Sequence, residues 1–347
     1  MQNETPRVLW ADTVRACAIF AVVLLHSASP LTYRYNEIPH LDWWVSNIYD
    51  SFARICVPLF VILSGSLLLG KEESYKIFFK KRFKIVVPFI SFGIFYIVMD
   101  KIYHGEAISI YKIIRMIISG PMWYHLWFFY MILGLYLITP VLRKWVKQAN
   151  RPDYLYFIIL WFIVSSIIPI IKSLFQIEFG MEMLFFSGYI GYFILGYKLK
   201  EVKLNKLSTM ILFAVFIFAY VVTILGSFVL TKINKGEYNG YFFNYLSPNV
   251  IVMALSGFTI IKNIKIQNAG DFFNKILINI SKASFGIYLI HVFILMILNK
   301  GILGLAVNGY LINPIVGIPI TAIMCTTVSF AIVYILQKIP IAKFIVP

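Results

Sequence analysis

Three ionisable residues lie inside the first apolar stretch of the chain. They are Asp12, Arg15 and His26, within the segment RVLWADTVRACAIFAVVLLH that runs from Arg7 to His26. A charged side chain in the hydrocarbon core costs roughly 2.5–3.5 kcal/mol on insertion scales, so such residues indicate a functional site by default. The alternative is that Arg15 is a snorkelling or ion-paired structural charge and His26 a residue at a helix end.

The spacing of these residues favours the functional interpretation. Arg15 and His26 are eleven positions apart, which is three helical turns plus roughly 20° at about 100° per residue. Both side chains therefore project from one side of a helix, about 16 Å apart along its axis. Asp12 lies one turn before Arg15 and is close enough to pair with it.

A second group of charges surrounds the segment KKRFKIVVP. Lys81, Arg82 and Lys84 precede an apolar run, with only Glu72 and Glu73 nearby to balance them. A helix N-terminus combined with basic side chains forms an anion site that suits phosphates. Ordinary charge bias between membrane spans is the alternative.

Small and aromatic residues suggest further sites. Ser64 and Gly65 lie in the segment LSGSLL, where small residues indicate either close helix packing or a passage for a slender ligand. Arg54 lies near the other end of the same apolar run, where it either snorkels or binds substrate. His291 falls near the middle of a later apolar run and either hydrogen-bonds a neighbouring helix or supports chemistry.

The segment GPMWYHLWFFY concentrates aromatic side chains at the start of one apolar run. It contains Trp123, Tyr124, His125 and Trp127. Such residues form either an interfacial aromatic belt or a platform on which sugar rings stack, with His125 as a polar contact.

The elements that position these residues are predicted to be membrane helices. The chain has 347 residues, of which 60% are hydrophobic and 13% charged, about half the charged share of a soluble domain. Windows of about 20 apolar residues predict an all-α polytopic bundle of about ten transmembrane helices. The predicted spans are 9–29, 47–69, 85–102, 124–142, 154–172, 182–199, 207–230, 242–261, 278–298 and 312–336. Residues 105–119 are too short and basic to span and are expected to lie amphipathically at one surface.

The charges between the spans predict their orientation. Segments on one side carry 20 Lys and Arg residues and those on the other carry nine, which places both termini in the cytoplasm. The net charge of +16 therefore does not indicate nucleic-acid binding. Cys17, Cys56 and Cys325 fall in apolar segments without metal or disulfide spacing, so they are expected to be packing residues and no metal site is expected.

Six segments, spread in order over the chain, form one pattern. They are DTVRACAIFAVVLLH, FVILSGSLL, KRFK before IVVP, HLWFFYMILGLYLITPVL, GYFILGYKL and SFGIYLIHVF. Together they resemble the acyltransferase-3 family, the ten-span integral membrane O-acyltransferases that modify bacterial surface polysaccharides. Arg15 and His26 have the spacing of that family. Lys81 and Lys84 stand where many relatives carry two arginines, which argues against bidentate phosphate binding there.

The resemblance implies one membrane-embedded acyltransferase domain over residues 1–347, with no soluble domain, as a multi-pass protein of the bacterial inner membrane. It implies acyl-coenzyme A, usually acetyl-CoA, as a cytoplasmic co-substrate and a glycan or lipid-linked glycan as acceptor, with no bound cofactor. Membrane lipids are the expected surroundings, nucleic acid is not an expected partner, and a homodimer is compatible with the apolar surface.

The same resemblance suggests roles for the residues. His26 acts as general base on the acceptor hydroxyl or accepts the acyl group itself, and Arg15, held by Asp12, orients the donor arm. The donor's phosphates are expected at Lys81, Arg82 and Lys84, and its arm at Ser64 and Gly65. The acceptor is expected at Arg54, Trp123, Tyr124, His125 and Trp127, with His291 in support.

Two other functions fit parts of the sequence. A transporter or flippase for polysaccharide or lipid-linked glycan is the main alternative, because ten spans with buried charge and a basic inner face suit export of an anionic glycan. Against it, the chain shows no convincing pair of Gly- or Pro-broken helices in two halves. A non-catalytic membrane scaffold is the third possibility, and it predicts that Arg15 and His26 tolerate alanine.

Overall fold

Every regular element in the described part of the chain is helical. The computed structural model describes residues 8–105, 110–175, 188–264, 270–301, 304, 306–340 and 342–346. The longer helices are α1 (Leu9–Thr32), α2 (His40–Ala53), α3 (Cys56–Leu68), α4 (Tyr75–Arg82), α5 (Val86–His104), α6 (Ile110–Ser119), α7 (Trp127–Gln148), α8 (Arg151–Phe162), α9 (Ile168–Phe175), α10 (Ile190–Leu199), α11 (Lys206–Ile233), α12 (Pro248–Asn263), α13 (Asp271–Lys300) and α14 (Pro314–Leu336). Short turns are η1 (Phe83–Ile85), η2 (Tyr124–Leu126), the π-helical η3 (Ile163–Ile167), η5 (Tyr241–Phe243) and η7 (Ala342–Phe344). The predicted all-α class is confirmed.

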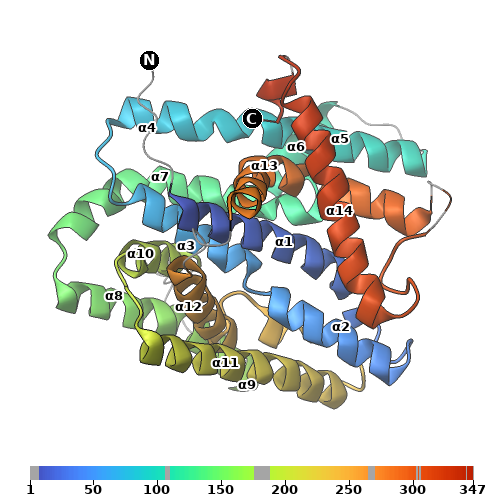
Figure 1. Ribbon diagram of the computed structural model, residues 1–347, viewed down its shortest axis with the longest axis horizontal. Helices are drawn as coiled ribbons and strands as arrows, with labels where there is room; N and C mark the ends of the chain where they lie inside the picture. The colour runs from blue at the N-terminus through green and yellow to red at the C-terminus, as the bar shows by residue number, and fades with distance from the viewer. Residues whose placement is uncertain are drawn as a thin grey trace.

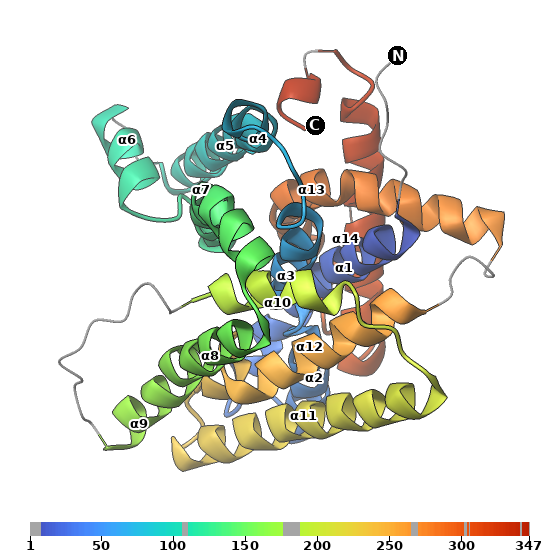
Figure 2. The same cartoon turned by 90° about the vertical axis from the view of Figure 1, so that its left-hand side faces the viewer.

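Nine helical segments in the described residues are long and apolar enough to cross a bilayer. They coincide with nine of the ten predicted spans. The remaining prediction, 182–199, corresponds to the 10-residue helix α10 in its described part, and residues 182–187 lie outside that part. Within the predicted surface segment 105–119, α6 forms a short separate helix at the edge of the bundle (Figure 2). These findings confirm a polytopic helical protein.

Helix α1 lies at the centre of the bundle (Figures 1 and 2). It packs against α2, α3, α12, α13 and α14. In its most apolar window 72% of residues are buried inside the protein, against 22% for α11, which lies on the periphery. The helix that carries the ionisable residues is therefore surrounded by protein rather than by lipid.

The second predicted span is broken into two helices. Helix α2 ends at Ala53, a turn occupies Arg54 and Ile55, and α3 begins at Cys56. Pro58 explains the break, because a proline has no backbone N–H and its ring clashes with the carbonyl four residues earlier, here that of Arg54. The interruption places the Arg54 side chain at a bend inside the protein.

Helices α3 and α10 approach each other at two glycines. A Cβ atom on Gly65 would lie 1.8 Å from the carbonyl oxygen of Phe193, and one on Gly196 would lie 2.0 Å from that of Ile62. Small residues allow this backbone contact between membrane helices. The small residues of α3 therefore pack against α10, as one of the two sequence interpretations proposed.

Candidate active site

Three histidines from distant parts of the chain meet beside the C-terminal third of α1. The ring of His26 lies 5.2 Å from that of His291 on α13, measured between centroids. The ring of His291 lies 5.3 Å from that of His125 on η2. His125 is 2% exposed and His291 is fully buried, whereas His26 is half-buried. We call these three residues the histidine cluster.

A cavity of about 70 Å³ opens beside His26. It is lined by Val22, Leu25, His26, Cys56, Val57, Tyr124, His125, Trp127, Phe128, Tyr245 and Tyr288. This space holds a few water molecules or a small chemical group. No carboxylate is among its lining residues, so in the described part of the chain His26 is the most accessible base there. The structure thus brings four predicted site residues together around one cavity: His26, Tyr124, His125 and Trp127.

Hydrogen bonding defines the state of His291. Its Nδ1 atom lies 2.7 Å from the carbonyl oxygen of Tyr288. A carbonyl only accepts, so Nδ1 carries the proton and Nε2 carries the lone pair when the ring is neutral. Among the described residues, this Nε2 and both ring nitrogens of His125 are buried without a hydrogen-bond partner. The cluster therefore offers unsatisfied nitrogens next to the cavity.

Arg15 and Asp12 form a separate polar group near the start of α1. Ser281 on α13 accepts a hydrogen bond of 2.9 Å from Arg15 Nη1 and donates one of 2.5 Å to Asp12 Oδ1. Arg15 Nη1 and Asp12 Oδ1 are 3.6 Å apart, which confirms the predicted proximity. The Arg15 side chain is 32% exposed and does not line the cavity beside His26. Ser281 links α1 to α13 and fixes the orientation of Arg15.

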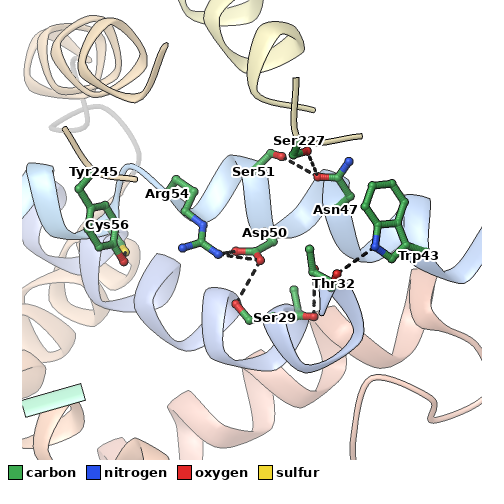
Figure 3. A network of polar contacts seen from close by, with 11 residues as sticks. Ser29, Thr32, Trp43, Asn47, Asp50, Ser51, Arg54, Cys56, Ser227 and Tyr245 are labelled. Carbon is green, nitrogen blue, oxygen red and sulfur yellow. Dashed lines mark hydrogen bonds and ion pairs between the residues drawn. The ribbon is translucent and has the colours of Figure 1, made fainter. Parts of the chain in front are cut away.

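Arg54 belongs to a buried network at the bend between α2 and α3 (Figure 3). Its Nη2 atom lies 2.8 Å from Asp50 Oδ2, and Ser29 on α1 donates to the same oxygen over 3.1 Å. The guanidinium stacks on the Phe243 ring at 4.4 Å. Arg54 is only 7% exposed, so it does not snorkel. Breaking one partner of such a buried pair is strongly destabilising, because the other charge is left unpaired.

The basic turn converges on one acidic residue. Glu73 lies 2.8 Å from Lys81 Nζ, 3.2 Å from Arg143 Nη2 and 3.9 Å from Arg82 Nη2. Arg143 on α7 also donates to the carbonyl of Leu68 over 2.9 Å. Lys84 is exposed on η1. The predicted phosphate-binding residues thus lie together at one end of the bundle, with Lys81 and Arg82 held by Glu73.

Acidification is expected to loosen this end of the protein. Burial raises the pKa of the Glu73 carboxyl, but hydrogen bonds from Lys81 and Arg143 outweigh it and hold the pKa below its ordinary value. A lowered pKa means that the stabilisation is present above the unfolded-state pKa and is lost as pH falls through the folded-state pKa. We expect Glu73→Gln to lower the thermal unfolding temperature at pH 7, by the equivalent of about 2 kcal/mol. We also expect the unfolding temperature of this variant to fall less steeply than that of the wild type as the pH drops below about 5. Glu37→Gln is the control, since its partner Arg34 is exposed. Equal pH profiles for wild type and Glu73→Gln would contradict the assignment.

The remaining predicted site residues lie apart from the cavity. Ser64 Oγ donates to the carbonyl of Phe60 in its own helix over 2.7 Å, and Gly65 contacts α10. Trp123 packs on Tyr96, with ring centroids 5.3 Å apart and planes at 17°. Trp123 therefore contacts Tyr96 and does not line the cavity beside His26.

Sequence reasoning missed several residues of the site. Tyr245 and Tyr288 line the cavity, and Ser281 and Asp50 hold the two arginines. Asp50 and Arg54 are four residues apart in an apolar run, a pairing pattern that is visible in the sequence. The tyrosines carry no such local signal, because Tyr245 reaches the cavity from the turn before α12 and Tyr288 from α13.

The fold and the site define a polytopic α-helical membrane protein with a histidine centre inside the bundle. The sequence profile of the acyltransferase domain family Acyl_transf_3 matches residues 8–334. The chain therefore belongs to the acyltransferase-3 family and is a membrane acyltransferase, as its six motifs predicted. Comparisons with curated proteins and with solved structures found no match.

Proposed function

We propose that this protein moves an acetyl group from acetyl-coenzyme A to a hydroxyl of a surface or lipid-linked polysaccharide in the bacterial inner membrane. Membership of the acyltransferase-3 family supports the reaction type. The main observation behind the other parts of the proposal, the site of transfer and the role of His26, is the cavity of about 70 Å³ beside His26. The imidazole of His26, a side chain that can act as a base, lines this cavity inside the protein and supports the proposal.

In the proposed reaction, His26 removes the proton from the acceptor hydroxyl as the oxygen attacks the thioester carbonyl. The tetrahedral intermediate collapses, the carbon–sulfur bond breaks, and the coenzyme A thiolate takes the proton back from His26. The products are the acetyl ester and free coenzyme A, so no other reactant is needed. His291, with its ring against that of His26, supports the base.

The donor is proposed to enter from the end of the bundle that carries the basic turn. Lys81, Arg82 and Lys84 offer positive charge to its phosphates. Arg15, held by Ser281 and Asp12, lies on α1 between that end and His26, where it orients the donor arm. Ser64 lies on α3, which also packs against α1.

The acceptor is proposed to meet His26 from the opposite end. Tyr124 and Trp127 flank the cavity, and aromatic rings of this kind stack on sugar faces. His125 adds buried nitrogens that lack partners among the described residues. Cys56 and Tyr245 line the same cavity, and their side chains contact each other. Arg54 lies next to this pair and does not itself line the cavity.

Release of free thiol from acetyl-coenzyme A tests the function against its rivals. The purified protein in nanodiscs is mixed with acetyl-coenzyme A and a membrane extract that contains polysaccharide precursors, and thiol is followed with a chromogenic reagent. We expect thiol release together with base-labile acetyl groups on the glycan fraction. A transporter or flippase would move glycan without thioester cleavage, and a scaffold would do neither.

Removing the basic side chains is expected to weaken donor binding. The double variant Lys81→Ala/Lys84→Ala should raise the KM for acetyl-coenzyme A by at least roughly tenfold, since even one charge-assisted hydrogen bond is worth about 1.5–3 kcal/mol. The kcat should change little. Lys200→Ala/Lys203→Ala removes two exposed lysines from another loop of the same predicted side and is the matched control. Equal KM values for both double variants would remove the basic turn from the donor site.

A further inference from the structure

A second pocket lies between the last turns of α5 and α13. Its volume is about 290 Å³, near the lower limit of the roughly 300–1,000 Å³ that is usual for ligand sites. It therefore suits one ring rather than a long chain. Its walls include Asp100, Tyr103, His104, Trp123 and Lys300. We call it the α5–α13 pocket.

The pocket combines aromatic faces with both hydrogen-bond acceptors and donors. The Asp100 carboxylate, 36% exposed, lies 3.4 Å from His104 Nδ1. Lys300 Nζ lies 3.8 Å from the centroid of the Tyr103 ring. Trp123 Nε1 is buried and has no partner among the described residues.

The pocket shares a wall with the active site. Trp123 lines the pocket and stacks on Tyr96, whose ring lies 5.1 Å from that of His125 in the histidine cluster. The next residue, Tyr124, lines the cavity beside His26. A ligand that spans the Trp123–Tyr124 step would thus reach from this pocket toward the base.

The pocket lies at the opposite end of the bundle from the basic turn. Lys84 and Tyr103 belong to one membrane span and are nineteen residues apart, which is about 28 Å along a helix. The donor phosphates and this pocket therefore cannot share one small ligand. The pocket is placed for the other substrate.

We propose that the α5–α13 pocket binds an uncharged pyranose ring of the acceptor glycan, next to the sugar that is acylated at His26. This inference rests on the proposed function. Carboxylate oxygens of Asp100 accept from sugar hydroxyls, and the ammonium of Lys300 donates to them. One carboxylate and one ammonium leave no net charge to recruit an anionic sugar, while Tyr103 offers a ring face for stacking.

Saturation-transfer NMR on the full chain in nanodiscs, free of glycoside detergents, tests the pocket. The probes are methyl glycosides of glucose, galactose, mannose and N-acetylglucosamine, with methyl glucuronide as a charged comparison. We expect transfer to at least one neutral glycoside. Tyr103→Ala, which removes the ring face proposed for stacking, and Asp100→Asn should each reduce that signal at least fivefold. Tyr111→Ala, in the exposed helix α6, should leave it unchanged.

The outcomes separate this inference from the proposed function. Three results would contradict a neutral-sugar site in the α5–α13 pocket: binding of the glucuronide alone, no signal from any glycoside, or a signal that both pocket variants retain. Thiol release from acetyl-coenzyme A in the presence of the membrane extract, measured on the same samples, reports on the transferase. If the glycoside signal depends on the pocket but the wild type cleaves no thioester, the proposed transferase function is contradicted. The pocket would then still be a sugar-binding site. Thermal unfolding of each variant shows that it is folded.

Discussion

Replacing His26 with alanine is expected to lower the kcat for acetyl transfer by about 10²–10⁴-fold, the usual contribution of a positioned general base. The KM for acetyl-coenzyme A should change little, because the phosphate-binding residues lie at another part of the protein. The rate is measured with radiolabelled acetyl-coenzyme A and the glycan fraction as acceptor. Among the residues that line the cavity in the described part of the chain, no other basic side chain is as exposed as that of His26. A large effect is therefore expected.

His26→Gln is the second variant, since it keeps a polar side chain of similar length and tests for folding defects. His40→Gln is the matched control, because His40 is exposed at the start of α2. Glycan labelling within a few-fold of wild type in His26→Ala would remove His26 from the role of base. Acid-quenched protein that carries label on His26 in the absence of acceptor would instead show that His26 accepts the acyl group itself.

The parts of the site that lie on one helix follow from the sequence. Asp12 and Arg15 are one turn apart on α1, and the structure places them 3.6 Å from each other. The break between α2 and α3 is also local, since Pro58 acts on the carbonyl of Arg54. Such features depend only on the regular geometry of a helix, so the spacing of residues in the sequence predicts them.

The parts of the site that join helices do not follow from the sequence. His26, His125 and His291 meet only because η2 and α13 pack beside α1, and no periodicity encodes that contact. The sequence indicates only that Glu73 is a countercharge near the basic turn. In the structure it is the residue that Lys81, Arg82 and Arg143 all contact. Arg143 comes from a helix 70 residues later in the chain, so its role is a property of the fold.

Gly65 shows how one residue type supports two interpretations. A glycine in α3 either lets the donor arm pass close to the backbone or lets α10 approach. The contact with Phe193 demonstrates the second. For the donor-passage interpretation to hold, the donor arm must reach the same face of α3 at Gly65 that contacts α10. The two interpretations predict different results for the substitution Gly65→Ala.

Gly65→Ala is expected to cause severe loss of folded protein. The added Cβ would lie 1.8 Å from the carbonyl oxygen of Phe193, and backbone atoms cannot rotate away as a side chain can, so α3 and α10 must separate. Overpacking costs typically 1–3 kcal/mol even where side chains adjust, and the total stability of a protein is about 5–15 kcal/mol. The measurements are yield of monodisperse protein after extraction and the thermal unfolding temperature.

Gly134→Ala is the matched control, because Gly134 lies in α7 with nothing within 4 Å of the added Cβ. Alanine is the better helix former by about 1 kcal/mol, so this variant should be at least as stable as wild type. A Gly65→Ala protein that is as stable as wild type, but has a raised KM for acetyl-coenzyme A, would contradict the packing role. It would make Gly65 part of the donor passage, and the α3–α10 contact would then have to relax without loss of stability.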